Sequence, residues 1–235
     1  MMDILSTNPF FGLFLTFFFF LLGTMFNRRW PGNPLFNPLI FSITCIIVLL
    51  LVTGISYEQY NEGGRFINLW ITPATVALAI KLEKNFVYLK TYYTAILSGI
   101  ALGVLFHTAI LVIVSILFQF NQELVATLFP KSITTAIALG VSESLGGIVS
   151  LTVAIVVFTG VLGTVVGPPI FALLKINDPV AQGVALGSGS HAMGTAKAIE
   201  LGDVQAAMSG LSIVLTGIVV VILAPFVMGF VGVLF

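Results

Sequence analysis

Long uninterrupted apolar runs are the feature that most restricts what this chain can become. A bilayer core about 30 Å thick needs about 20 apolar residues for each spanning helix. The chain holds eight apolar segments, at about 9–26, 36–55, 66–80, 89–119, 124–146, 148–173, 181–200 and 206–235. The first, second, fourth and last predict spanning helices, and the sixth is long enough as well. Because the runs do not alternate with period two, we expect an all-α polytopic membrane helix bundle and not a β-barrel.

The composition fits a lipid environment and excludes several functions. Apolar residues make up 58% of the chain and charged residues only 8%, whereas soluble domains carry about 25% charged residues. The formal net charge of zero offers no basic stripe to phosphates, so we expect no nucleic-acid partner. The sequence has no phosphate-binding loop of an ATPase, no nucleophile turn of a hydrolase and no cluster with metal-ligand spacing. We therefore expect a protein that is not an enzyme and that holds no metal or cofactor.

The flanks of the first segment predict its orientation. Arg28 and Arg29 follow the apolar run, at the place where a signal peptide would have small residues for cleavage. Because basic loop residues tend to stay in the cytoplasm, we expect residues 27–34 inside. If the second and third segments both cross the membrane, residues 57–65 lie outside.

Three of the segments are short and carry helix-breaking residues. We expect the third, fifth and seventh to be kinked or discontinuous near Pro73, Pro130 and Gly187–Gly194, respectively. Polar residues at the same points would supply partners for the backbone groups that each break sets free.

The chain resembles itself at a constant spacing of 57 residues. Pro73-Ala-Thr-Val-Ala-Leu-Ala-Ile80 aligns with Pro130-Lys-Ser-Ile-Thr-Thr-Ala-Ile137, and Gly103-Val-Leu105 aligns with Gly160-Val-Leu162. A further 57 residues on, Thr216-Gly217-Ile218 aligns with Thr159-Gly160-Val161. Separate matches at one offset indicate an internal repeat, although chance similarity among a few common residue types is the alternative. The repeat predicts a single integral membrane domain over residues 1–235, with repeat-like units at about 66–122, 123–179 and 180–235.

The first polar cluster lies in the stretch 129–138. It contains Lys131, Ser132, Thr134 and Thr135 directly after a proline that suits a first helical turn. The free N–H groups and the dipole of a helix start attract anions, so these residues predict a seat for a carboxylate. The alternative is a helix that begins at the membrane interface, with the lysine extended toward lipid headgroups.

The second polar cluster lies in the stretch 187–200. Its candidate binding residues are Ser188, Ser190, His191, Thr195 and Lys197. Such groups are costly in lipid, so we expect them to line a cavity or to pack inside the protein. A polar loop with a capped helix is the alternative. Lys197 and Glu200 are three residues apart and are expected to neutralise each other.

One shared cavity would satisfy both clusters, because buried ionisable residues in membrane segments usually face the interior of the bundle. We therefore expect His191 to lie near the turn 131–135. The other histidine, His107, stands alone in an apolar span and is expected to be a packing or hydrogen-bonded residue without a functional role.

Three of these segments resemble the hallmark segments of the LrgB/CidB family. They are Pro73-Ala-Thr-Val-Ala-Leu-Ala, Pro130-Lys-Ser-Ile-Thr-Thr and Ser190-His-Ala-Met-Gly-Thr-Ala, and the likeness runs from about residue 66 to the C-terminus. The resemblance implies a multi-pass protein of the bacterial cytoplasmic membrane, paired with a small LrgA/CidA-type protein that resembles phage holins. The family is named for antiholin-like control of murein hydrolases and cell lysis. Similar proteins are linked to pyruvate movement, and plastid relatives carry glycolate and glycerate.

Two functional hypotheses follow. The first is a secondary transporter or facilitator for a small monocarboxylate, in which the residues of both clusters bind the substrate and His191 or Glu143 carries a coupled proton. The second is a regulatory membrane protein that binds a holin-like partner and transports no solute. Its Gly- and Ser-rich segments would then be helix-packing surfaces. Both hypotheses leave room for a homo-oligomer.

Overall fold

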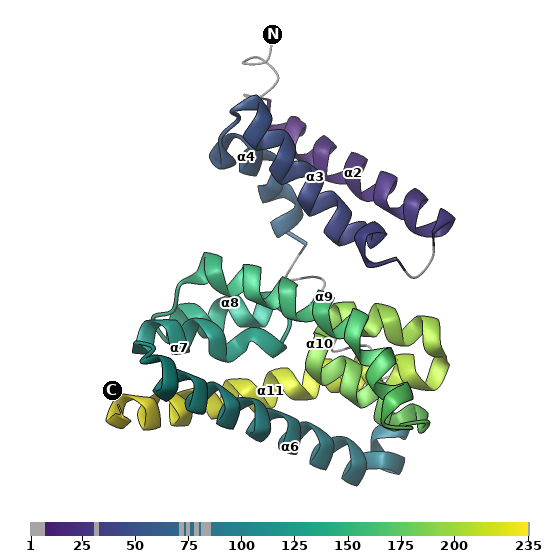
Figure 1. The fold of residues 1–235 in the computed structure, drawn as a ribbon, viewed down its shortest axis with the longest axis vertical. Helices are drawn as coiled ribbons and strands as arrows, with labels where there is room; N and C mark the ends of the chain where they lie inside the picture. The colour runs from purple at the N-terminus through teal and green to yellow at the C-terminus, as the bar shows by residue number, and fades with distance from the viewer. Residues whose placement is uncertain are drawn as a thin grey trace. The chain divides into compact units, whose positions relative to one another are not determined.

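The computed structural model describes residues 8–30, 33–70, 73, 76–77, 80 and 86–234. Within these ranges the regular elements are α-helices and short 3-10 helices without a strand, which confirms the all-α class. The chain divides into two compact units, Met1–Ala74 and Thr75–Phe235, and each is described by itself (Figure 1). The single membrane domain and the bounds of the repeat units stay predictions.

The first unit contains α2 (Pro9–Arg29), η1 (Pro34–Phe36), α3 (Pro38–Thr53) and α4 (Tyr57–Asn68). The side chains of Asn8 and Asn37 accept hydrogen bonds from the first turns of α2 and α3, and each helix begins with a proline that needs no donor partner. The helices pack closely: a Cβ at Gly12 of α2 would collide with the Tyr60 carbonyl of α4. The hydroxyls of Thr16 and Tyr60 lie 2.7 Å apart and join the same two helices.

Two features of this unit were not expected from the sequence. The second apolar segment forms a helix of only 16 residues, which at 1.5 Å per residue is shorter than the hydrocarbon core. Residues 57–65 form the greater part of α4, and their position outside the membrane stays a prediction. The sequence does mark the start of α4. Ser56 and Gln59 form a reciprocal capping box there, and such a pair is a signature of a helix N-terminus.

The second unit contains the two polar clusters. Its helices are α6 (Phe86–Phe118), α7 (Gln122–Leu128), η2 (Phe129–Ser132), α8 (Thr135–Ser144), α9 (Val149–Leu173), α10 (Pro179–Leu201) and α11 (Asp203–Leu234). Together with α2, the helices α6, α9 and α11 are the four in the described part of the chain that are long and apolar enough to cross a membrane. α10 packs against both α9 and α11, and α11 also packs along α6 (Figure 1).

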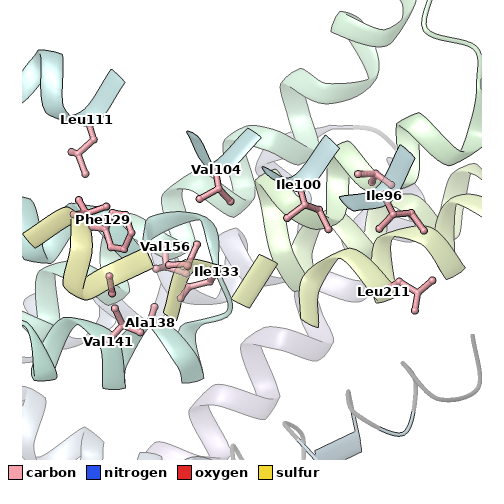
Figure 2. Close-up of a cluster of buried hydrophobic side chains, with 14 of the residues drawn as sticks. Ile96, Ile100, Val104, Leu111, Phe129, Ile133, Ala138, Val141, Val156 and Leu211 are labelled. Carbon is pink, nitrogen blue, oxygen red and sulfur yellow. The ribbon is translucent and has the colours of Figure 1, made fainter. Parts of the chain in front are cut away.

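One face of α6 contributes a row of side chains to the main buried cluster. Ile96, Ile100 and Val104 follow one another at helical spacing, and Figure 2 shows them in a row, with Phe129 and Val156 on other elements of the cluster. Lipid tails are as apolar as these side chains, so close packing contributes more to holding the helices together than exclusion of water does.

Glycines bring α10 close to both neighbours. A Cβ at Gly187 would meet the backbone of Ser209 in α11, whose Cα lies at 2.8 Å, and a Cβ at Gly183 would lie 2.6 Å from the Gln205 carbonyl oxygen. On the other side, a Cβ at Gly160 of α9 would lie 2.6 Å from the His191 ring, and one at Gly163 would collide with the Ser190 side chain. α11 therefore approaches α10 at backbone distance, and the backbone of α9 lies directly against side chains of α10.

Two of the three expected helix breaks are confirmed. Ile133 is extended, with φ −111° and ψ 172°, and separates η2 from α8 three residues after Pro130. His191 has φ 42° and ψ −131° in the middle of α10. The expected kink near Pro73 falls in a region that is mostly outside the described residues.

Candidate functional site

The start of α8 is a buried helix N-terminus without a side-chain cap. Thr134 occupies the N-cap position, yet its hydroxyl makes no capping bond. Its Oγ1 atom is buried and has no hydrogen-bond partner among the described residues, and the residue is only 8% exposed. The N–H groups of the first helical turn have no acceptor within their own helix. Half-buried Thr135 is the first residue of α8, so both predicted threonines lie at this helix start.

Lys131 lies in η2, immediately before this helix start. Its ammonium donates a hydrogen bond of 3.3 Å to the hydroxyl of Ser132, which is the one partner found among the described side chains. Lys131 also lines a cavity of about 410 Å³ between α6, α7 and η2, whose other polar wall residue is His107. The predicted residues Lys131 and Ser132 therefore remain next to each other and beside an open cavity.

The residues at the break in α10 are packed and hydrogen-bonded. The His191 ring donates from Nε2 to the Val156 carbonyl of α9 at 3.0 Å. The hydroxyls of Thr195 and Ser209 lie 2.8 Å apart, and Thr195 also donates to the His191 carbonyl. Ser190 is buried against Gly163. These three predicted binding residues join α10 to α9 and α11. They therefore have the helix-packing role that was the alternative to substrate binding.

The remaining predicted residues lie elsewhere. Ser188 donates to the Val184 carbonyl within α10 and lines a second cavity, of about 640 Å³, between α10 and α6. Lys197 forms an ion pair of 2.7 Å with Glu200, as expected. Glu143 is exposed near the end of α8, and its proton role and that of His191 stay predictions.

The two clusters are neighbours in space but do not line the same described cavity. η2 contacts α10, so the elements that carry the two breaks pack together. The two cavities above are lined by different members of the clusters, Lys131 in one and Ser188 in the other. One cavity shared by His191 and Lys131 stays a prediction.

His107 has a packing contact, as one of its two expected roles required. Both of its ring nitrogens are buried without a hydrogen-bond partner in the described part of the chain, so the other expected role, that of a hydrogen-bonded histidine, is not seen there. Its ring stacks on Phe129, with centroids 6.2 Å apart. The signal in the sequence was the rarity of an ionisable side chain in an apolar span, which by itself indicates a functional position. Thr216 of α11 has a buried hydroxyl in the same unpartnered state.

Residues 16–230 match the LrgB-like family. Three relatives, each called "Antiholin-like protein LrgB", come from Bacillus mycoides (strain KBAB4), Bacillus cereus (strain B4264) and Bacillus anthracis (strain CDC 684 / NRRL 3495). Each is 36% identical to this chain over 227 residues, which cover 97% of this chain and 99% of the relative. No solved structure matches the chain significantly. The four long apolar helices fit a multi-pass membrane protein. Because the family match covers nearly the full length, this protein belongs to the LrgB-like family.

Proposed function

We propose that this protein is a secondary transporter or facilitator of small monocarboxylates, such as pyruvate or glycolate, in the bacterial cytoplasmic membrane. It acts with a small holin-like membrane protein of the LrgA/CidA type and catalyses no covalent reaction. The observation that carries the proposal is the buried start of α8, where, among the residues that the structure describes, the Thr134 hydroxyl has no partner and the helix has no side-chain cap.

This helix start has the groups that a carboxylate needs. The unpaired N–H groups and the positive end of the helix dipole attract an anion. The Thr134 hydroxyl adds a donor, and Lys131, three residues earlier, adds a positive charge. An unpartnered buried hydroxyl costs about 1–3 kcal/mol, so a bound substrate would offset a cost that the empty protein carries.

The arrangement of the broken helices supports transport. The stretch 123–179 contains a helix broken between η2 and α8 and then the long α9, and the stretch 180–235 contains the broken α10 and then the long α11. The contact of η2 with α10 brings the elements that carry the two breaks together. Substrate sites at paired broken helices, with one repeat rocking against the other, are typical of secondary transporters.

The second candidate is an antiholin-like regulator of murein hydrolase activity and lysis, without a solute of its own. The names of the three Bacillus relatives favour it. That hypothesis uses the Gly- and Ser-rich segment as a packing surface for a partner. In the structure, Gly183, Gly187 and Ser190 face the chain's own α9 and α11, so this surface is already occupied.

Uptake of labelled pyruvate and glycolate into liposomes, with and without the small partner protein, tests the proposal. Wild-type protein is expected to accumulate label, and Lys131→Ala is expected to abolish uptake while remaining in the membrane. Lys131→Arg is expected to restore uptake only partly, because a planar guanidinium has a different geometry. The matched control is Lys90→Ala, which removes an exposed lysine beside Phe86 and is expected to transport normally. Absence of uptake by the wild type with the partner present would favour the regulator.

A further inference from the structure

We propose that the cavity between α6 and η2 is the binding site of the transported anion, and that His107 and Lys131 together select a monocarboxylate with an apolar body. This inference rests on the proposed function. It extends the proposed site from the start of α8, through Lys131, to this cavity, and it adds a second basic residue and an apolar body of the substrate. The supporting observations are the composition of the cavity wall, the hydrogen-bonding capacity that His107 and Lys131 leave unused among the described residues, and the open space beside Gly103.

The cavity wall is apolar except for two basic side chains. Phe106, Ile110, Leu111 and Leu128 form its apolar surface, and its volume is about 410 Å³. No acidic side chain occurs among the described residues that line it. Small-molecule sites typically have such a wall, largely hydrophobic with a few polar groups that fix the orientation of the ligand.

Both basic groups have hydrogen-bonding capacity that the protein leaves unused. A lysine ammonium has three donors, and among the described residues the ammonium of Lys131 has one hydrogen-bond partner, the neutral hydroxyl of Ser132 at 3.3 Å. A histidine ring has two nitrogens, and neither nitrogen of His107 has a partner in the described structure although both are buried. Each buried polar atom of this kind needs an explanation. A carboxylate would accept hydrogen bonds from both residues and would balance the lysine charge.

The His107 ring is held in place by a neighbour and not by hydrogen bonds. It stacks on Phe129, the first residue of η2, with an angle of 23° between the ring planes. Phe129 is fully buried and lies two residues before Lys131. The stacking therefore ties the position of the imidazole to the short helix that carries the lysine.

Gly103 leaves open space on the same face of α6. It lies one helical turn before His107 and lines the cavity, and a Cβ placed on it would meet no atom within 4 Å. Gly103 also lines the second cavity, and a larger side chain at this position would occupy space along the α6 face without a collision at its first carbon. The ligand body therefore has room along the α6 face beyond the basic groups.

The wall chemistry predicts which anions bind. A monocarboxylate places its charge at His107 and Lys131 and its apolar body against the phenylalanine and leucine side chains. Each added methylene gains about 0.8 kcal/mol, which is about a fourfold increase in affinity, until the cavity is filled. A dicarboxylate would bring its second charge against apolar side chains that offer it no donor, and it should bind much more weakly.

Binding to purified full-length protein tests the site directly. Calorimetric titration would use propionate, butyrate and hexanoate, with succinate and neutral hexanamide as comparisons. We expect affinity to rise about fourfold per methylene, and succinate and hexanamide to bind at least tenfold more weakly than butyrate and hexanoate, respectively. Equal affinity for succinate and butyrate would overturn the assignment of substrate class.

Four variants locate the site. His107→Phe keeps a ring to stack on Phe129, and Lys131→Met keeps the side-chain length, and both should bind butyrate at least tenfold more weakly. Gly103→Leu should lose hexanoate binding and retain propionate binding, since it shortens the apolar space alone. Thr108→Ala is the control, because the Thr108 hydroxyl bonds to the Val104 carbonyl in its own helix and the residue does not line the cavity.

The outcomes separate this inference from the proposed function. If the wild type takes up pyruvate and His107→Phe binds and transports like it, the cavity assignment is wrong and the transport function stands. If the carboxylates bind with the expected variant pattern but no uptake occurs, the site stands and transport fails.

An anionic lipid is the other source of a charged head on an apolar body. The same titrations in nanodiscs of phosphatidylglycerol and of phosphatidylcholine distinguish it. We expect butyrate to bind with similar affinity in both. If protein with intact His107 and Lys131 binds butyrate in phosphatidylcholine but not in phosphatidylglycerol, the anionic lipid occupies the cavity. That result would overturn the substrate assignment.

Discussion

The imidazole of His191 donates a hydrogen bond of 3.0 Å to the main-chain oxygen of Val156, and this bond fastens the break in α10 to the middle of α9. The residue therefore has two structural tasks. Its side chain makes the bond between the helices, and its backbone takes the positive φ that interrupts α10.

Substitutions at His191 separate these two tasks. Alanine and glycine both lose the bond to Val156, but only glycine adopts φ 42° without strain. A residue in a sparsely populated backbone region costs on the order of 1–3 kcal/mol, so we expect His191→Gly to be more stable than His191→Ala by about 1 kcal/mol. Thermal unfolding of both variants in detergent measures the difference. Equal melting temperatures would show that the break stores no backbone strain.

The contact between α10 and α11 predicts opposite effects for two glycines on the same helix. Gly187→Ala places a Cβ against the backbone of Ser209 and should destabilise the protein by about 1–3 kcal/mol. Gly189→Ala places its Cβ where no atom lies within 4 Å, and should be neutral or stabilising by about 0.5–1 kcal/mol. Melting temperatures of the pair in one detergent provide the measurement, and similar losses in both would contradict the close approach of the helices.

The unpartnered hydroxyl of Thr134 predicts a variant that is stable but inactive. Thr134→Val keeps the shape of the side chain and removes a buried donor that has no partner and makes no cap, so the melting temperature should stay the same or rise. Carboxylate uptake should fall at least tenfold, and Thr134→Ser should restore much of it. Ser115→Ala is the control, since that buried hydroxyl bonds to the Leu111 carbonyl within α6. Normal uptake by the valine variant would remove Thr134 from the site.

A buried group of three hydroxyls ties α7, α8 and α9 together and predicts a purely structural loss. The Ser142 and Thr152 hydroxyls lie 2.7 Å apart, Thr152 donates to the Thr127 carbonyl at 3.0 Å, and the Thr127 hydroxyl accepts from the Ile148 N–H at 2.8 Å.

Thr152→Val removes the central member of this group and leaves buried polar atoms without partners, which should cost about 1–3 kcal/mol. Ser144→Ala, at an exposed residue bonded within its own helix, should change stability by less than about 0.5 kcal/mol. Comparable melting temperatures for the two variants would contradict a structural role for the group.

Local features of the chain were enough to predict the helical class and the two breaks that the structure describes. Apolar length alone requires helices in lipid, because an unpaired backbone group is costly there. Pro130 and the glycines of 187–194 mark the breaks, because they weaken the hydrogen-bond ladder wherever they stand. The start of α4 was equally local, since Ser56 and Gln59 lie three residues apart, and it was overlooked.

The partners of the polar side chains depended on the tertiary structure. Ser190, His191 and Thr195 have the composition of a binding site, yet residues 14 to 35 positions away along the chain supply the bonds of His191 and Thr195. His107 was expected to pack or to form a hydrogen bond; in the fold it packs on Phe129 and lines a cavity with Lys131, and neither ring nitrogen has a partner in the described part of the chain. Residue type determines which hydrogen bonds a side chain can donate or accept, so this capacity can be predicted from the sequence. Whether a partner stands within hydrogen-bond distance depends on how distant helices pack, which only the folded chain decides.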